Sequence, residues 1–354
     1  MTASSLSSRS LLRVVAALVA AGIALLLSPA IAAHAAGDDA TWTVRTASNA
    51  FGSDRTSYGY TVDPGSSVED AIVVANHGDA PLDLSVYASD GYTTDSGQFD
   101  LLVAGATSVG IGAWLHADAG TVTIPAGRTV EIPFTVSVPD NATPGDYAGG
   151  IVTSLGAQQD AEGISVDRRL GIRVMLRVGG ALAPGLAVED PRIEWGGGFS
   201  PAGTGDATLT YTLHNTGNTL LSAQQSAVAT GPFGWFPVDA GDIDAPPQLL
   251  PGETWTVSVP IRGVPAVFWL AGTASITPLV TDASGSTTPL DVVTGTAVGW
   301  AVPWLLVIVA VVVAGLIVLI VRLRRRGRAT RQAQEDARVQ AAVEQALAEK
   351  ERVG

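Results

Sequence analysis

The segment TVTIPAGRTVEIPFTVSVP, residues 121–139, decides the fold class. Apolar residues occupy its even positions except Arg128, and threonine, serine or glutamate fills most of the odd positions. A period of two is typical of β-strands with one face in a core. Pro125–Gly127 interrupts the pattern, so the segment predicts two strands joined by a turn. Pro133 has no N–H for a strand ladder, which predicts an edge strand. The alternating apolar residues are Val122, Ile124, Val130, Ile132, Phe134, Val136 and Val138.

This pattern occurs twice in the chain. The letters TVSVP at 135–139 recur at 256–260, and a proline–glycine turn precedes each copy. Upstream of each copy, an alternating strand ends in Asn-x-Gly, at 76–78 and at 215–217. Asn-x-Gly is typical of hairpin turns with positive φ. The repeat therefore predicts two domains of one architecture that join near residues 179–185.

Each copy has short strands at regular spacing and no helical pattern. This arrangement predicts an all-β ectodomain of two tandem immunoglobulin-like antiparallel β-sandwiches, at 36–182 and 183–299. The cysteine pair of antibody domains is missing, because the chain contains no cysteine. The prediction therefore depends on the strand pattern, and stability has to come from core burial without disulfides.

The two ends of the chain predict export and anchoring. Residues 1–35 combine a positive start, an apolar run and a small-x-small cleavage site, which is typical of a signal peptide. Residues 300–321 are uncharged and long enough for a transmembrane helix, with Trp300 and Trp304 at its outer boundary. An arginine cluster opens the tail 322–354, so we expect a cytoplasmic C-terminus, a single pass through the cell membrane and an ectodomain outside.

The charge and motif content excludes several classes of function. The chain has 33 acidic and 20 basic residues, and the arginine-rich tail leaves the ectodomain more acidic still. Such a surface argues against nucleic acid as a partner. The sequence lacks a nucleophile elbow, a phosphate loop, a dinucleotide motif and a histidine pair spaced for a metal, so it predicts no enzyme and no cofactor.

Two acidic loops suggest a weak calcium hypothesis, because calcium prefers carboxylate oxygens. One loop carries Asp90, Asp95 and Asp100, and the other carries Asp239, Asp242 and Asp244. Neither loop has the EF-hand spacing, and solvated turn residues are the alternative interpretation for both. Apart from this, the sequence predicts no metal site.

Aromatic residues near the first acidic loop form the candidate ligand site. Sugar recognition pairs an aromatic face with carboxylate acceptors, and the residues available for it are Tyr87, Asp90, Tyr92, Asp95 and Trp114. The alternative is that Tyr87 and Trp114 are core residues.

A second aromatic group lies in the segment GPFGWFPVD. Phe233, Trp235 and Phe236 lie there between glycine and proline residues, which is typical of an exposed protein-binding loop. Core or interdomain packing is the alternative for these three residues.

The stretch VPDNATPGDYAGGIVT, residues 138–153, resembles a site but predicts scaffolding. Val138 ends one strand, and the following residues are expected to cross to the other sheet. Tyr147 then takes the place of a corner tyrosine, whose hydroxyl bonds to upstream backbone. Gly149 and Gly150 lack phosphate-loop spacing and are expected to let neighbouring groups approach closely.

The first domain resembles the N-terminal peptidoglycan-binding domain of the WxL-interacting protein family. The resemblance covers most of residues 41–180, and the layout of signal peptide, two sandwiches, one span and basic tail also matches this family. The composition suggests an actinobacterial-type member. It implies peptidoglycan binding by the first domain and host binding by the second. The segments that carry it are Tyr60, Pro64–Gly65, Val74–Asn76, Val86–Gly91, Ser96–Gly97, Trp114, Ile124–Gly127, Ile132–Phe134, Val138–Pro139 and Ala142–Ile151.

These observations predict a non-catalytic, membrane-anchored adhesion or binding protein that associates with peptidoglycan or another surface partner. The alternative is a structural or accessory envelope protein that binds only another secreted protein. Retention on purified cell wall distinguishes the two.

Overall fold

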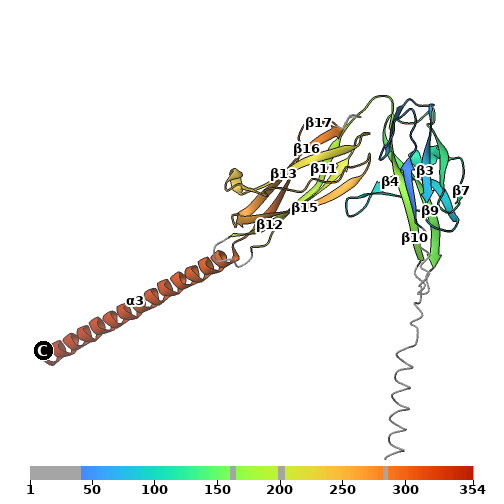
Figure 1. Cartoon of the computed structure of the whole chain (residues 1–354). Helices are drawn as coiled ribbons and strands as arrows, with labels where there is room; N and C mark the ends of the chain where they lie inside the picture. Colours follow the sequence, from blue (N-terminus) through green and yellow to red (C-terminus); the bar gives the residue numbers. More distant parts are fainter. Residues whose placement is uncertain (1–40, 160–164, 198–203, 282–285, 354) are drawn as a thin grey trace, which may run out of the picture.

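The computed structural model describes residues 41–159, 165–197, 204–281 and 286–353. Figure 1 shows two β-sandwiches in tandem and one long helix that leaves the second of them. The fold class predicted from the sequence is confirmed, since four antiparallel-rich sheets form two immunoglobulin-like sandwiches. The predicted signal peptide lies outside the described residues.

The first sandwich packs a four-stranded sheet on a six-stranded one. The first sheet has the order β1 (Trp42–Thr46), β3 (Ser67–Asn76), β8 (Thr129–Ser137) and β6 (Leu115–Ala117). The second has the order β2 (Tyr58–Val62), β10 (Ser165–Val178), β9 (Gly145–Gln159), β4 (Leu82–Thr93) and β5 (Phe99–Leu101), with β7 (Thr121–Ile124) beside β4 and the short helix α2 (Ile111–Trp114) nearby.

The alternation of residues 121–139 builds the core of this sandwich. Ile124, Ile132, Phe134, Val136 and Val138 are all buried in one cluster, as the period of two predicts. These side chains meet the inward residues of the opposite sheet, and their burial replaces the missing disulfide as the source of stability.

The predicted edge position of Pro133 is wrong, because β8 lies between β3 and β6. The Asp118 N–H donates to the Pro133 carbonyl, just beyond the end of the short strand β6. The N and C=O of one strand residue point to the same side. The missing N–H of Pro133 therefore faces β6 and leaves the ladder with β3 intact.

The second sandwich repeats this plan. One sheet has the order β11 (Leu186–Trp195), β12 (Thr204–Asn215) and β15 (Thr254–Pro265). The other has the order β14 (Val238–Asp239), β13 (Leu221–Thr230), β16 (Phe268–Thr281) and β17 (Thr287–Pro289), with β18 (Val293–Ala301) also paired to β16 and the 3-10 turn η1 (Pro232–Gly234) after β13. Strands β8 and β15, which carry the repeated TVSVP, hold equivalent places next to β3 and β12.

The Asn-x-Gly motifs are not the hairpin turns that the sequence suggests. Asn76 ends β3, and the chain then crosses to β4 in the opposite sheet. Its buried amide donates to the carbonyls of Ala80 and Ile124 at 2.8 and 3.0 Å, and its Oδ1 accepts the Gly78 N–H at 2.8 Å. A buried side chain, rather than positive φ, forms this corner.

Asn215 makes the same set of bonds in the second sandwich. Its amide donates to Thr219 O at 2.8 Å and Leu249 O at 3.0 Å, and its Oδ1 accepts from Gly217 N at 3.1 Å. The repeated Asn-x-Gly motif therefore marks the point in each sandwich where the chain crosses from one sheet to the other.

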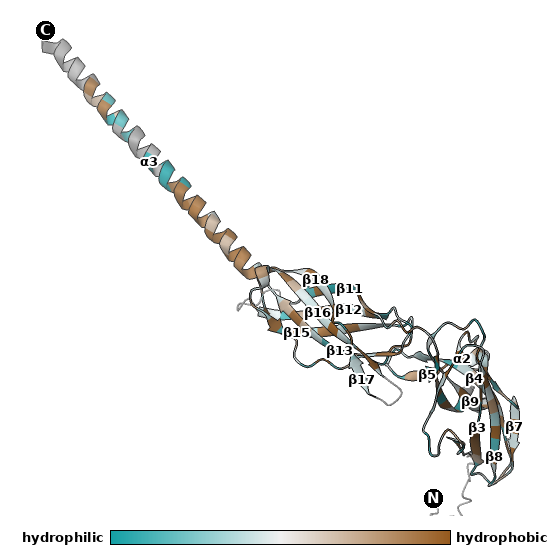
Figure 2. Ribbon diagram, turned by 90° about the horizontal axis from the view of Figure 1, so that it is seen from above, coloured by the Kyte–Doolittle hydropathy of each residue, from teal (hydrophilic) through white to brown (hydrophobic). Residues whose placement is uncertain are grey.

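The helix α3 (Trp304–Val353) leaves the second sandwich two residues after β18. Its first part, Trp304–Arg326, is long and apolar enough to cross a membrane and is not buried against the sandwiches. Figure 2 shows this apolar part next to the sandwich and a more polar continuation beyond it. Each sandwich has its own core, to which no described residue of α3 contributes.

Candidate functional site

The structure does not bring the predicted ligand residues together. Tyr87 and Asp90 are three residues apart in the regular ladder between β4 and β9, so they lie on opposite faces of the sheet. Trp114 packs against the core, with its ring 4.6 Å from that of Tyr147. Tyr92 and Asp95 are exposed. The core alternative fits Trp114.

Asp90 organises a loop of the first sandwich. Its carboxylate accepts N–H groups from Val109 at 2.6 Å, Gly110 at 2.9 Å and Gly112 at 2.7 Å. Three backbone donors use most of the acceptor capacity of the carboxylate. Asp90 therefore holds α2 against β4 in place of contacting a sugar.

The acidic loops do not form cation sites among the residues that the structure describes, where no three His, Cys, Asp or Glu side chains gather. Asp100 pairs with Arg169 at 3.0 Å, and Asp95 is exposed. Asp239 lies in β14, and Asp242 and Asp244 follow in the loop after it.

The segment 138–153 forms the corner that its sequence suggests. Tyr147 lies in β9 just after the crossing from β8, and its hydroxyl donates to the Thr143 carbonyl at 2.9 Å. A methyl group added at Gly150 would lie 2.6 Å from the Ile172 carbonyl, and one at Gly149 would meet the Ile111 side chain and the Ser89 carbonyl. Both glycines thus permit close packing.

The same corner also connects the two sandwiches, which the sequence did not reveal. Asp146 is buried and accepts two bonds from Arg177, at 2.6 and 2.8 Å. Its carboxylate also accepts the Leu220 N–H at 2.8 Å, and its own N–H donates to the Asn218 carbonyl at 2.8 Å. The Asn218 amide returns a bond to the Pro144 carbonyl at 2.9 Å.

A second set of hydrogen bonds also connects the two sandwiches. The Glu253 carboxylate accepts the Thr93 N–H at 2.8 Å and the Thr93 hydroxyl at 2.7 Å. It also accepts the Leu250 N–H at 2.9 Å within the second sandwich. Hydrogen bonds from β9 and from β4 therefore connect the first sandwich to the second at two places.

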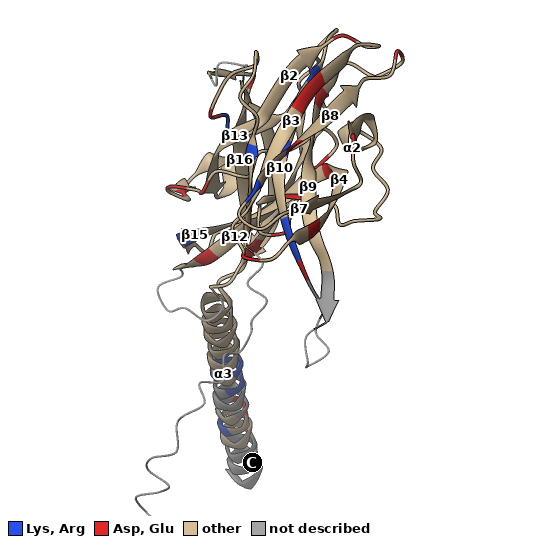
Figure 3. Cartoon of the chain, turned by 45° about the vertical axis from the view of Figure 1, so that its right-hand side comes forward, with Lys and Arg blue, Asp and Glu red and all other residues tan. Residues whose placement is uncertain are grey.

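Three arginines share the outer face of β10. Arg169, Arg173 and Arg177 are four residues apart, which corresponds to about 13 Å along a strand. Figure 3 shows several Lys or Arg positions along this strand. Arg169 pairs with Asp100 and Arg177 pairs with Asp146. Arg173 has no carboxylate within ion-pair distance among the described residues.

Arg173 lines a groove in the first sandwich and two smaller hollows that reach Leu220 and Gln248 of the second. Its guanidinium lies over the Phe99 ring at 4.1 Å, and burial lowers its pKa below the ordinary value of an arginine. An arginine remains charged at neutral pH. The groove on one side of Arg173 measures about 490 Å³ and is lined by Thr56, Ser57, Phe99, Asp100, Leu101, Val152, Arg169, Gly171 and Arg173.

The groove can therefore accept an anion. Thr56 and Ser57 are exposed and offer hydroxyl donors in the lining of the same groove. A planar guanidinium stacked on an aromatic ring keeps its edge N–H groups free for a carboxylate. No line of reasoning from the sequence singled out Arg173. The sequence signal for this site is the spacing of Arg169, Arg173 and Arg177, which places all three on one face of a strand.

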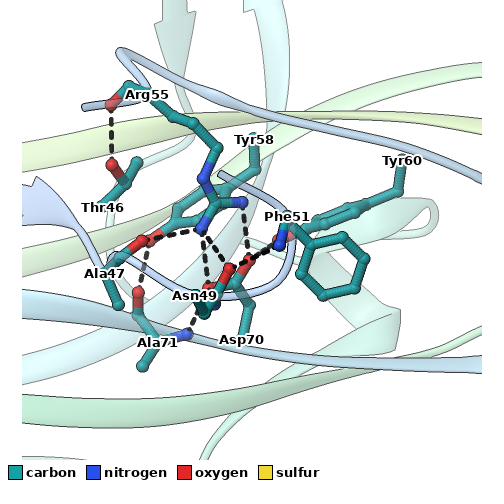
Figure 4. Close-up of polar contacts among 9 residues, drawn as sticks. All are labelled: Thr46, Ala47, Asn49, Phe51, Arg55, Tyr58, Tyr60, Asp70 and Ala71. Atoms are coloured by element: carbon teal, nitrogen blue, oxygen red, sulfur yellow. Dashed lines mark hydrogen bonds and ion pairs between the residues drawn. The ribbon is translucent and has the colours of Figure 1, made fainter. Parts of the chain in front are cut away.

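The buried cluster around Asp70 is the other polar feature that the sequence analysis missed (Figure 4). The Asp70 carboxylate accepts bonds from Arg55 at 2.8 and 3.1 Å, from Asn49 at 2.7 Å and from the Tyr60 hydroxyl at 2.7 Å. It also accepts the Ala71 N–H at 2.8 Å. Burial alone would raise the pKa of Asp70, but these hydrogen bonds outweigh it and lower the pKa.

This cluster is structural, because its acceptors are satisfied by the fold. Arg55 also donates to the Ala47 carbonyl at 2.9 Å, and the Tyr58 hydroxyl donates to Ala71 O at 2.6 Å. Burial raises the pKa of both Tyr58 and Tyr60, so neither phenol is an acid near neutral pH. The sequence signal is an aspartate at a core position of the β3 alternation.

The aromatic loop after β13 is exposed. Phe233, Trp235 and Phe236 have 86, 60 and 59% of their surface accessible. The alternative that they pack in the core or between domains is therefore excluded. Phe233 and Trp235 contact each other, with their rings 5.6 Å apart.

Comparison with known proteins gives fold-level similarity only. No protein-family model matches the chain, and no curated protein matches it. The YadV chaperone is 12% identical with a TM-score of 0.32, covering 72% of this chain and 98% of its own. The class 5 fimbriae chaperone CfaA is 10% identical with a TM-score of 0.37, covering 74% and 100%. The CupB2 chaperone of Pseudomonas aeruginosa is 11% identical with a TM-score of 0.29, covering 70% and 99%. Values this low carry no argument about function.

Proposed function

We propose that this protein is a non-catalytic, membrane-anchored surface protein that binds carboxylate-bearing ligands in the groove around Arg173. The observation that carries the proposal is a charged guanidinium, without a carboxylate partner among the described residues, in an otherwise acidic ectodomain. Its neighbours Arg169 and Arg177 are both paired with carboxylates, so Arg173 is the member of this row on β10 that can pair with a ligand.

The arrangement of the chain supports a surface role. The apolar part of α3 would anchor the protein, and the arginines after it favour a cytoplasmic tail with both sandwiches outside. The hydrogen bonds at Asp146 and Glu253 would hold the groove at a set height and angle above the membrane. A rigid two-domain stalk suits a protein that presents a binding surface.

Peptidoglycan is the first source of the ligand that we propose. Its stem peptides end in free carboxylates, and residues 41–180 resemble the peptidoglycan-binding domain of WxL-interacting proteins. An acidic ectodomain is repelled by an anionic wall. Carboxylate recognition by Arg173 would offset this repulsion, because the protein side of the contact is positively charged.

Retention on purified cell wall tests this function. Residues 41–303 contain both cores and are expected to bind, whereas Arg173→Gln is expected to reduce retention at least tenfold. Arg45→Gln removes the same charge from an exposed position of β1 and is the matched control. Wall with amidated stem carboxylates should retain neither protein. Equal retention of wild type and Arg173→Gln would refute the site.

The wild-type and Arg173→Gln proteins also test the alternative role, in which the chain binds only another secreted protein. Loss of wall binding in all samples, together with a single protein crosslinked in cells to wild type but not to Arg173→Gln, would place the carboxylate on a secreted protein. Adding calcium or a chelator to the wall assay tests ion bridging. Calcium dependence that survives Arg173→Gln would point to the acidic loops.

A further inference from the structure

The loop after β13 presents aromatic rings without any charged residue. It runs GPFGWFP from Gly231 to Pro237. Backbone bonds within the loop close it, with Gly231 N donating to Trp235 O at 2.7 Å and Trp235 N donating to Pro232 O at 3.2 Å. A closed loop of this kind holds its rings outward rather than letting them collapse onto the sandwich.

Two of these aromatics have an unusual backbone. Phe233 has φ of 59° and Phe236 has φ of 54°. The left-handed region costs a bulky residue about 1 kcal/mol or more. Neither ring recovers this cost by burial, since both are exposed. Contact of the rings with something outside the chain would offset this cost.

The loop lies at the end of the second sandwich where the span begins. Strands β13, β16 and β18 are neighbours, so Thr230 at the end of β13 is about 10 Å from Val298, three residues before the end of β18. Phe268 starts β16 opposite Ala301, which ends β18. Figure 1 shows the start of α3 at this end of the sandwich and the first sandwich at the other.

More exposed aromatics surround the same point. Phe268 has φ of 72° and is 58% exposed. Trp300 is 77% exposed, and Trp304, the first residue of α3, is 53% exposed. Only Val302 and Pro303 separate β18 from α3, and two residues reach at most about 7 Å. The second sandwich therefore cannot move far from the bilayer.

We infer that residues 231–237, together with Phe268 and Trp300, form a second membrane contact that inserts into the headgroup region of the leaflet where α3 enters. Aromatic rings prefer this region, and interfacial anchors set helix tilt. A tilt within the usual 0–40° brings a loop set to one side of the span to the bilayer surface. Loop and helix would then hold the ectodomain at one inclination. The inference depends on the membrane span of the proposed function.

Site-directed spin labelling tests the contact, because the natural chain contains no cysteine. The full chain carrying Trp235→Cys with a nitroxide is reconstituted in vesicles of three parts phosphatidylcholine to one part phosphatidylglycerol. The nitroxide is expected to be at least fivefold less accessible to an aqueous nickel complex than one at Thr288→Cys. Thr288 is exposed in β17, near the opposite end of β16, and is the matched control.

A label at Val312→Cys separates the two possible failures. If residue 312 is shielded and residue 235 is as open to nickel as residue 288, the span stands and the loop contact is overturned, which leaves the loop to a protein partner. If residue 312 is also open, the span itself fails and the inference fails with it.

A second measurement does not depend on a label in the loop. Energy transfer from a donor at Asp95→Cys to acceptor lipids reports the height of the first sandwich. The triple variant Phe233→Ser, Trp235→Ser, Phe236→Ser is expected to broaden the height distribution while the second sandwich keeps its melting temperature. An unchanged distribution in the folded variant would contradict the inference.

Discussion

Replacing Asp70 by asparagine tests whether the buried cluster holds the first sandwich together. If the amide oxygen stays at the Oδ1 position, the NH₂ group faces Nη1 of Arg55 and the Tyr60 hydroxyl, which now meet a donor. The Tyr60 hydroxyl can turn to accept, but Arg55 cannot. Arg55 also keeps its charge, and its side chain is only 15% exposed. Leaving one partner of a buried pair uncompensated costs about 3–5 kcal/mol.

The assay is urea unfolding of residues 41–303, followed by hydrogen exchange so that each sandwich is read separately. Asp70→Asn should lower the free energy of unfolding of the first sandwich by about 3 kcal/mol and leave the second unchanged. The exposed control Asp118→Asn should change it by less than about 0.5 kcal/mol. Adding Arg55→Met should recover part of the loss. A loss below about 1 kcal/mol for Asp70→Asn would refute the reasoning.

The cluster also predicts acid sensitivity of the first sandwich. The folded pKa of Asp70 is lower than its ordinary value of 3.8. The stabilisation is therefore complete above about pH 4 and is lost as the pH falls through the folded pKa. Unfolding measured from pH 6 to pH 2 should show this loss in wild type and a shallower one in Asp70→Asn. Parallel curves would contradict the assignment.

Three further changes have defined outcomes. Asn215→Ala removes the donor of the buried Thr219 carbonyl, whereas Leu249 O keeps the Leu221 N–H, and should destabilise the second sandwich by about 1–3 kcal/mol, as seen by hydrogen exchange. Asp146→Ala with Glu253→Ala should broaden the distance distribution between spin labels on the two sandwiches. An unchanged width would show that the hydrogen bonds of Asp146 and Glu253 do not fix the angle between the sandwiches. Gly149→Ala should cost about 1–3 kcal/mol through overpacking, whereas Gly59→Ala, where nothing lies within 4 Å, should be nearly neutral in thermal melts.

Local patterns were sufficient to predict the sandwiches and the repeat. The alternation in 121–139 fixes which side chains face the core, since side-chain direction in a strand depends only on sequence position. The same rule helps to explain why the hairpin turns predicted at the Asn-x-Gly motifs are wrong. Asn76 and Asn215 occupy core positions of the alternation, and the sequence alone did not show that their amides would bond to distant carbonyls such as Ile124 O and Leu249 O.

The candidate site shows where prediction from sequence ends. Tyr87 and Asp90 are close in sequence, yet the pleat separates them onto two faces of β4. Arg173, which sequence reasoning passed over, became the candidate because Asp100 and Asp146 pair with its neighbours on the strand. Which arginine lacks a carboxylate depends on residues far away in the chain, and no local pattern contains that information.

The sequence by itself determined the all-β class, the duplication, the apolar segment before the basic tail and the corner role of the 138–153 segment, because each depends on periodicity or composition over a short window. Only the tertiary structure decided that this corner forms hydrogen bonds with the second sandwich and that Asp70 is buried in a hydrogen-bonded cluster. It also decided that the GPFGWFP loop lies at the end of the sandwich where α3 begins. Those facts depend on which strands become neighbours, and pairing between distant strands is set by the packing of the whole fold.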